Sequence, residues 1–336
     1  MLFFVILFLA LSLLAYVLFG GADFGAGIIE IFAGNKTRKT ITHAIAPVWE
    51  ANHIWLILVV VILFMGFPLI YAQVSLYLHI PLVVLLLGIV LRGTAFTFRH
   101  YDAVIDRSQN YYSFIFKLSS VISPFFLGVI MGALILGKIP LEPGSFYDAF
   151  MAPWLNWFCF VLGIFTCCLF AFLAAVYLIG EAEDQVIRKH FLRMARNANL
   201  ATVVAGGFVF LSAEVSGYSL ATQFLQSTPA IVAMVLATLS LPVLWWSLLR
   251  EQLILPRFLA GFQATAILGA WFWVQYPVVI RYADGSYLGL LDTAAPFPTI
   301  RQLALALIVG SLLILPALYF LMKTFKAREA LMDREV

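Results

Sequence analysis

Apolar runs of roughly 20 residues follow one another along this sequence and constrain its fold more than any other feature. A helix of that length crosses the hydrocarbon core of a bilayer. Only 11% of the 336 residues are charged, whereas roughly 25% are charged in ordinary soluble domains. The sequence therefore predicts an all-α polytopic membrane protein, with residues 1–336 forming one membrane domain.

Nine runs qualify as spans, and the segments between them are too short for a separate soluble domain. They cover approximately residues 2–33, 44–65, 71–91, 114–137, 151–180, 198–216, 229–249, 258–280 and 300–322. The first and fifth exceed one bilayer thickness, so we expect them to tilt or to project beyond it. The apolar N-terminus lacks the basic start of a signal peptide, and we interpret it as a retained first span.

Basic residues alternate between the connections and predict the orientation of the chain. All but three of the 20 Lys and Arg residues fall on one side of the predicted spans; the exceptions are Lys138, Arg281 and Arg301. Cytoplasmic loops carry the excess of Lys and Arg. We therefore expect the N-terminus outside and the C-terminus in the cytoplasm. The net charge of +3 implies no nucleic-acid partner.

Cysteine and histidine usage argues against a metal centre in this chain. Cys159, Cys167 and Cys168 lie in one apolar run, where we expect them to act as small packing residues. The sequence has five histidines and no paired pattern typical of a bis-histidine haem bundle. We expect this chain alone to bind neither haem nor metal.

Carboxylates inside the predicted spans are informative because they are costly: inserting an acidic side chain at the centre of a span costs about +2.5 to +3.5 kcal/mol. Asp23, Glu50 and Glu214 are the candidates for embedded carboxylates, and we expect Glu30 at the interface. Such residues mark functional sites without naming the reaction.

The start of the second span carries a polar row. On one helix His43, Pro47 and Glu50 would share a stripe, and Glu50 and His53 would lie one turn apart with Asn52 alongside. Such a row can pass protons. The alternative, that Glu50 only forms structural hydrogen bonds, fits the sequence equally well.

Three segments give the sequence a family resemblance. They are the glycine-rich segment 21–27, whose small residues also suit close helix contact, the segment 45–56 that opens the second span, and the run from Arg92 to Arg99. With these segments the chain resembles subunit II of the cytochrome bd-type quinol oxidases. Gly20 and Ala22 depart from the family's usual Asp-Gly-Phe-Asp, whereas Asp23 is retained. Glu50 and His53 stand where the family often has Asp and Gln.

The resemblance implies a role in a bacterial or archaeal cytoplasmic membrane. It implies a heterodimer with a haem-bearing subunit I, which holds two b-type haems and one d-type haem, oxidises quinol and reduces dioxygen to water. A small single-span accessory subunit, membrane lipids and quinone are further expected partners.

For this chain the resemblance implies support of subunit I and no complete active site of its own. It also implies a cytoplasmic proton-input path through Glu50, Asp23, His53 and Asn52. Arg92, Arg99 and Trp49 are expected to make polar contacts on the cytoplasmic side or with the partner subunit.

Two other functions remain compatible with the sequence. A proton-coupled secondary transporter would need broken helices and polar residues at the bilayer midplane, and several prolines could break spans. A structural membrane scaffold would lose only stability when Glu50 is neutralised.

Overall fold

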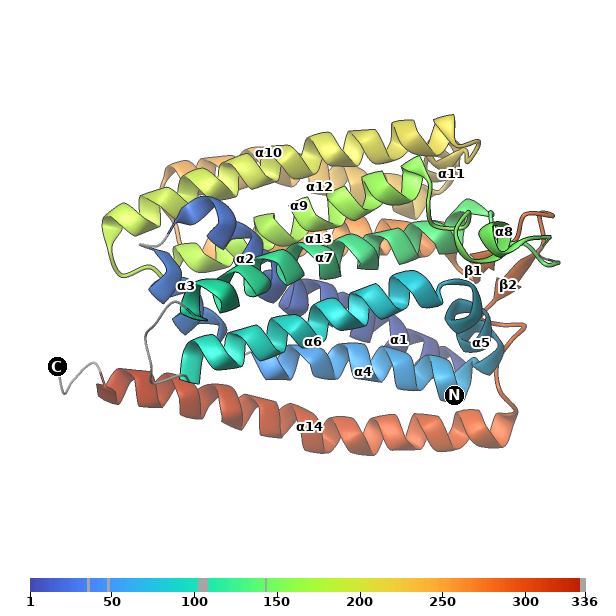
Figure 1. Ribbon diagram of the computed structural model, residues 1–336, viewed down its shortest axis with the longest axis horizontal. Helices are drawn as coiled ribbons and strands as arrows, with labels where there is room; N and C mark the ends of the chain where they lie inside the picture. Colours follow the sequence, from blue (N-terminus) through green and yellow to red (C-terminus); the bar gives the residue numbers. More distant parts are fainter. Residues whose placement is uncertain (35–36, 47–48, 102–107, 143, 333–336) are drawn as a thin grey trace.

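The protein is an elongated bundle whose long helices run along one common axis (Figure 1). The computed structural model describes residues 1–34, 37–46, 49–101, 108–142 and 144–332, without the side chains at 50–51, 100–101, 108, 318–319 and 321–332. Within these residues, eight helices are long and apolar enough to cross a membrane, or nine if one bent pair counts as a single span. The predicted all-α polytopic class is confirmed.

The elements follow in the order α1 (Leu2–Ala15), the π-helical turn η1 (Tyr16–Gly20), α2 (Gly21–Ala33), α3 (Arg38–Ile45), α4 (Trp49–Gly66), α5 (Pro68–Tyr77), α6 (His79–Tyr101), α7 (Ser108–Leu136), α8 (Phe146–Phe150), α9 (Trp157–Ile179), α10 (Gln185–Val215), α11 (Leu220–Gln226), α12 (Thr228–Leu249), α13 (Ile254–Gln275), β1 (Val278–Arg281), β2 (Tyr287–Gly289) and α14 (Phe297–Met332). The strands β1 and β2 form an antiparallel hairpin.

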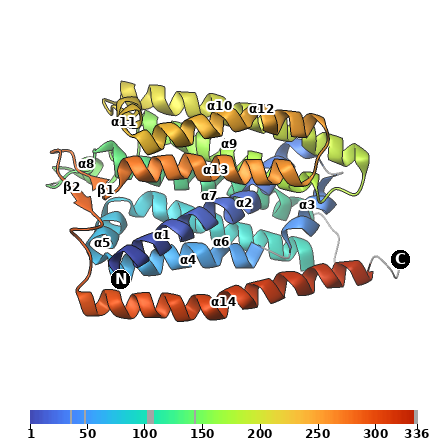
Figure 2. The same cartoon turned by 180° about the vertical axis from the view of Figure 1, so that it is seen from behind.

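Helix α9 lies at the centre of the bundle and packs against α2, α7, α10 and α13. Helix α14 lies along the outside, against α1 and α4 (Figures 1 and 2). One end of the bundle, here called the basic end, carries α3 and the start of α10. The opposite hairpin end carries α5, α8, β1 and β2 (Figure 2). Helix α1 begins at the hairpin end and α14 ends at the basic end.

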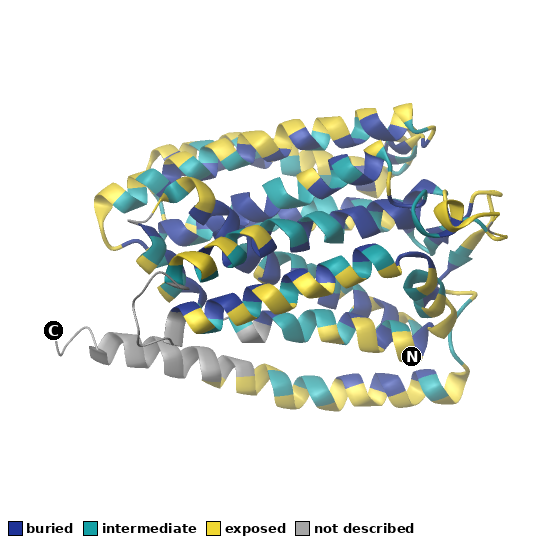
Figure 3. Ribbon diagram, in the orientation of Figure 1, coloured by how far each residue is buried: buried dark blue, intermediate teal, exposed yellow. Residues whose placement is uncertain are grey.

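The outer faces of the bundle are apolar because lipid, not water, is the surrounding solvent. Exposed residues run in stripes along α10 and the described part of α14, while buried residues concentrate between the helices (Figure 3). The exposed side chains on α14 include Leu312, Leu313 and Leu315. Such a surface would cause aggregation of a water-soluble protein, so the burial pattern agrees with membrane insertion.

The third predicted span, 71–91, is displaced in the structure. The chain bends by 115° between α4 and α5, and the long apolar helix begins only at His79. Pro68 starts α5 at its first turn, where a missing N–H costs nothing. Both sides of the bend are apolar, so hydropathy alone does not locate it.

Other helices also begin away from their predicted starts, and two of them show why. The fifth span was predicted from 151, but α9 begins at Trp157 because the Asn156 side chain accepts a hydrogen bond from the Cys159 backbone N–H and caps the helix. The sixth was predicted from 198, but α10 begins at Gln185, capped by Asp184. The first turns of α10 are polar, so an apolar scan misses them.

The glycine-rich segment of α2 packs closely against its neighbours, as predicted. A Cβ atom at Gly25 would overlap the backbone carbonyl of Phe170 on α9, and one at Gly27 would overlap the hydroxyl of Ser120 on α7. Small residues allow this approach of membrane helices. The close packing brings the polar residues of α2 within reach of long side chains from α6.

Gly25→Ala should therefore destabilise the protein. Overpacking costs roughly 1–3 kcal/mol, and the overlap here is with backbone, which cannot rotate away. Thermal unfolding of the purified protein should occur at a clearly lower temperature than for the wild type. Gly207→Ala on α10 is the control, because a Cβ there meets nothing within 4 Å. Equal melting of the two variants would contradict this packing argument.

Candidate functional site

Asp23 and Arg92 form an ion pair in the interior, near the basic end of the bundle. The Arg92 guanidinium contacts both Asp23 carboxylate oxygens at 2.7 Å and donates to the Asp23 backbone carbonyl at 2.8 Å. Its Nε donates to the Ser120 hydroxyl at 3.1 Å. Both side chains are at most 1% exposed. The fork of the guanidinium thus matches the carboxylate in a bidentate, charge-assisted contact.

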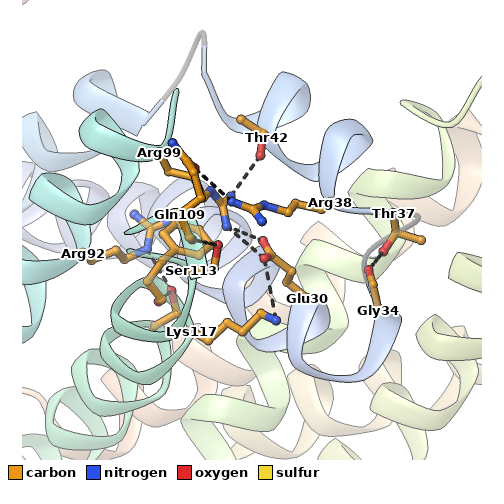
Figure 4. A network of polar contacts seen from close by, with 12 residues as sticks. Glu30, Gly34, Thr37, Arg38, Thr42, Arg92, Arg99, Gln109, Ser113 and Lys117 are labelled. Carbon is orange, nitrogen blue, oxygen red and sulfur yellow. Dashed lines mark hydrogen bonds and ion pairs between the residues drawn. The ribbon is translucent and has the colours of Figure 1, made fainter. Parts of the chain in front are cut away.

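A second ion pair lies seven residues further along each of the same two helices. Arg99 Nη1 contacts the Glu30 carboxylate oxygens at 2.9 and 2.8 Å, and Arg99 Nη2 donates to the Thr42 hydroxyl of α3 at 2.9 Å. Lys117 of α7 lies 3.9 Å from Glu30. Figure 4 shows these side chains converging from α2, α3, α6 and α7. Seven residues are about two helical turns, so the two pairs form successive rungs of one ladder.

Aromatic rings enclose the ladder. The Arg92 guanidinium carbon lies 4.7 Å from the centre of the Phe24 ring and 5.0 Å from that of Phe116, and the Arg99 carbon lies 4.2 Å from the Phe116 ring. Cations are attracted to such ring faces, more strongly where water is excluded. The rings and the carboxylates together hold both guanidinium groups in fixed positions.

Three further polar side chains gather around the Asp23–Arg92 pair. Tyr16 is buried in the π-helical turn, and its hydroxyl interacts electrostatically with Asp23 and Arg92, as does the His53 ring. His53 also contacts the Phe24 ring edge-on at 6.1 Å. Tyr16 Oη, Asn52 Nδ2 and His53 Nδ1 have no hydrogen-bond partner among the described residues. Buried polar atoms normally have partners, so this group is suited to binding water and exchanging protons.

The structure brings some of the predicted site residues close together. Asp23, Asn52 and His53 lie together, and Trp49 packs on Phe96 with ring centres 5.4 Å apart. Glu50 belongs to α4, but its side chain is among those that the structure does not describe. Arg92 and Arg99 make their ion pairs within this chain.

One sequence expectation is wrong: His43 does not share a helix with Glu50, because it lies on the separate helix α3 and is exposed. The structure adds the surroundings of two further carboxylates. Glu214 is exposed on the surface of the bundle, in the last turn of α10. Glu30 is enclosed within the bundle, 1% exposed, because Arg99 and Lys117 reach it from α6 and α7.

Sequence reasoning missed Tyr16 and the pairing of Glu30. Nothing marked Tyr16, because an aromatic residue in a span is ordinary. The pairing did have a signal: Glu30 follows Asp23 by the same seven residues that separate Arg99 from Arg92. Among the described residues, no three His, Cys, Asp or Glu side chains gather as a metal site.

The long apolar helices and internally neutralised charges define a polytopic helical membrane protein with a buried polar cluster near one end. The sequence matches the family of cytochrome bd terminal oxidase subunit II over residues 1–325. The chain belongs to this family.

Individual relatives agree with this assignment. The cytochrome bd ubiquinol oxidase subunit 2 of Bacillus subtilis is 30% identical over 148 residues, 43% of each chain. The cytochrome bd-I ubiquinol oxidase subunit 2 of Escherichia coli K12 is 25% identical over 204 residues, covering 59% of this chain and 52% of that protein. The matched parts thus span about half of these relatives or less.

A solved structure shares the fold. A chain of the bd oxidase from Geobacillus thermodenitrificans superposes with a TM-score of 0.74 at 20% identity, covering 96% of this chain and 98% of the other. The arrangement of helices is therefore that of a bd oxidase chain over nearly the whole length.

Proposed function

We propose that this chain is the non-haem subunit of a terminal quinol oxidase that couples quinol oxidation to reduction of dioxygen to water. Family membership over residues 1–325 supports this. The observation that carries the proposal is the buried cluster of Asp23, Asn52, His53 and Tyr16 near the basic end, because dioxygen reduction consumes protons that must cross low-dielectric protein. The chain alone has no complete active site.

The partner would be the haem-bearing subunit I, with two b-type haems and one d-type haem, and with membrane quinol as electron donor. A small single-span accessory subunit and lipids would complete the assembly. The haems would supply the electron transfer and oxygen chemistry. This chain would contribute an apolar support surface and a path for protons.

The charge distribution supports a cytoplasmic position of the basic end in a bacterial or archaeal cytoplasmic membrane. Each dioxygen takes up four electrons and four protons to give two waters, and two quinols supply the electrons while releasing four protons. Proton uptake from the cytoplasm and release outside would separate charge across the membrane and generate a proton-motive force without a pump.

Glu50 is the proposed carrier, with Asn52 and His53 beside it on α4. Asp23 takes a different part from Glu50, because Arg92 engages both of its carboxylate oxygens at 2.7 Å. Asp23 thus acts on the path through its position and hydrogen bonding, as part of a neutral ion pair.

Purification of the tagged chain from native membrane tests the assignment. We expect it to arrive with a second, haem-containing chain whose visible spectrum contains b-type and d-type bands, and with quinol-driven oxygen uptake. Dissociated from that partner, the chain should be colourless. A chain that arrives alone and transports a solute with protons would favour a secondary transporter. A haem spectrum from the isolated chain would contradict the assignment of the haems to the partner.

A further inference from the structure

A cavity of about 280 Å³ lies between η1, α2, α3, α4, α9 and α13, toward the basic end. Asp23 and Asn52 line its deep end. Tyr177 and Arg257 line it near the end of α9 and the start of α13. The wall between consists of apolar side chains and small residues such as Ala22 and Gly261. The cavity therefore connects the polar cluster with the basic end of the bundle.

An ion pair lies at the outer end of this cavity. Arg257 Nη2 donates to the Glu181 carboxylate at 2.7 Å and to the Tyr177 backbone carbonyl at 2.6 Å. About a third of each charged side chain is exposed, 34% for Arg257 and 35% for Glu181. The glycine at position 180 leaves room for the guanidinium, which a Cβ there would overlap. Glu181 thus presents a solvent-accessible carboxylate beside the cavity.

The cavity can hold water. A cavity needs only roughly 10–15 Å³ of such space to hold one water, so this one has room for several. Asn52 Nδ2 at the deep end and Arg257 Nε at the outer end have no partner among the described residues. An acyl chain would also fit the apolar wall, but it would leave both donors unsatisfied, at a free-energy cost. Small side-chain rotations would let water reach both enclosed donors, and the charged side chains of Asp23 and Arg257 in the lining favour water over an acyl chain.

We propose that this cavity is the proton access route of the chain, with Glu181 as the carboxylate that exchanges protons with the cytoplasm. Arg257 is the positioning residue that holds Glu181 at the outer end. Protons then pass along the water to the group around Asn52 and Asp23. This step is proton transfer alone: no bond to carbon changes and no electron is transferred. This inference rests on the proposed function, because it assigns the origin of the protons that Glu50 carries.

Filling the cavity tests the route. Gly261→Leu adds a side chain from α13 where a Cβ meets nothing within 4 Å, and Ala22→Leu adds one from the opposite wall on α2. In the purified, fully haem-loaded oxidase, each should lower quinol-driven oxygen reduction by about tenfold, or one 1.36 kcal/mol step in the barrier. The solvent deuterium isotope effect should rise, because proton uptake becomes rate-limiting. Gly269→Leu is the matched control on α13, since its Cβ also meets nothing within 4 Å and it does not line the cavity.

The carboxylate is tested separately. Glu181→Gln should slow proton uptake measured in proteoliposomes, whereas Glu183→Gln, an exposed carboxylate two residues later, should not. If turnover and the isotope effect were unchanged in both cavity-filling variants, the proposed proton route would be wrong. If Glu50→Gln still abolished turnover in that case, the proposed function would survive, with protons entering elsewhere. Loss of a co-purified phospholipid from Gly261→Leu at an unchanged isotope effect would instead identify a lipid site and overturn the proposal.

Discussion

Replacing Glu50 by Gln should lower quinol-driven oxygen reduction by about a hundredfold or more, within the range by which positioned acid–base groups contribute, while all haems remain bound. Gln keeps the size and hydrogen bonding of Glu but cannot release a proton. Electron transfer into the haems should be nearly normal in stopped-flow absorbance measurements. Proton uptake from the basic side should be slowed more than electron transfer. Glu50→Asp should retain substantial activity, because it restores a titratable carboxyl.

Glu214→Gln is the matched control for this substitution. Glu214 is exposed in the last turn of α10, toward the hairpin end, so its loss should leave turnover unchanged. If fully haem-loaded Glu50→Gln turned over at the wild-type rate, Glu50 would not belong to the proton path. It would then be a structural hydrogen-bonding residue. A scaffold function would then fit this part of the chain better.

Much of the fold was predictable because the bilayer imposes a length on each apolar run. The first span, 2–33, coincides with the continuous helical segment Leu2–Ala33. The burial of Asp23 was also predictable, since it is flanked by apolar and small residues inside that run. The glycines beside it predicted the close helix contact for the same reason: only small residues let membrane helices approach closely.

The remainder depends on tertiary structure that an apolar scan does not contain. Glu30 lies near the end of its helix, so its local sequence resembles an interface, and its burial is decided by Arg99 and Lys117 from other helices. The bend before Pro68 separates two segments that are both apolar. Tyr16 lies in a π-helical turn that the apolar sequence does not reveal, and such turns occur frequently at functional sites.

Arg92→Gln should be the most destabilising of the substitutions in the ladder. It would leave the buried Asp23 carboxylate without its bidentate partner, and breaking a buried pair by removing one member costs about 3–5 kcal/mol. We expect a low yield of assembled protein and a markedly lower unfolding temperature in detergent. Arg301→Gln, at an exposed position in the first turns of α14, should unfold like the wild type.

The double variant Asp23→Asn/Arg92→Gln separates the cost of an unpaired charge from the loss of packing. Two neutral amides can hydrogen-bond to each other, so the double variant should unfold at a higher temperature than Arg92→Gln alone. Substitutions at the Glu30–Arg99 rung should not be fully additive with these, because Arg92 and Arg99 share the Phe116 ring although two helical turns separate the rungs by about 10 Å. A double variant no more stable than Arg92→Gln would show that Arg92 stabilises the bundle through Ser120, Phe24 and Phe116, and not by neutralising Asp23.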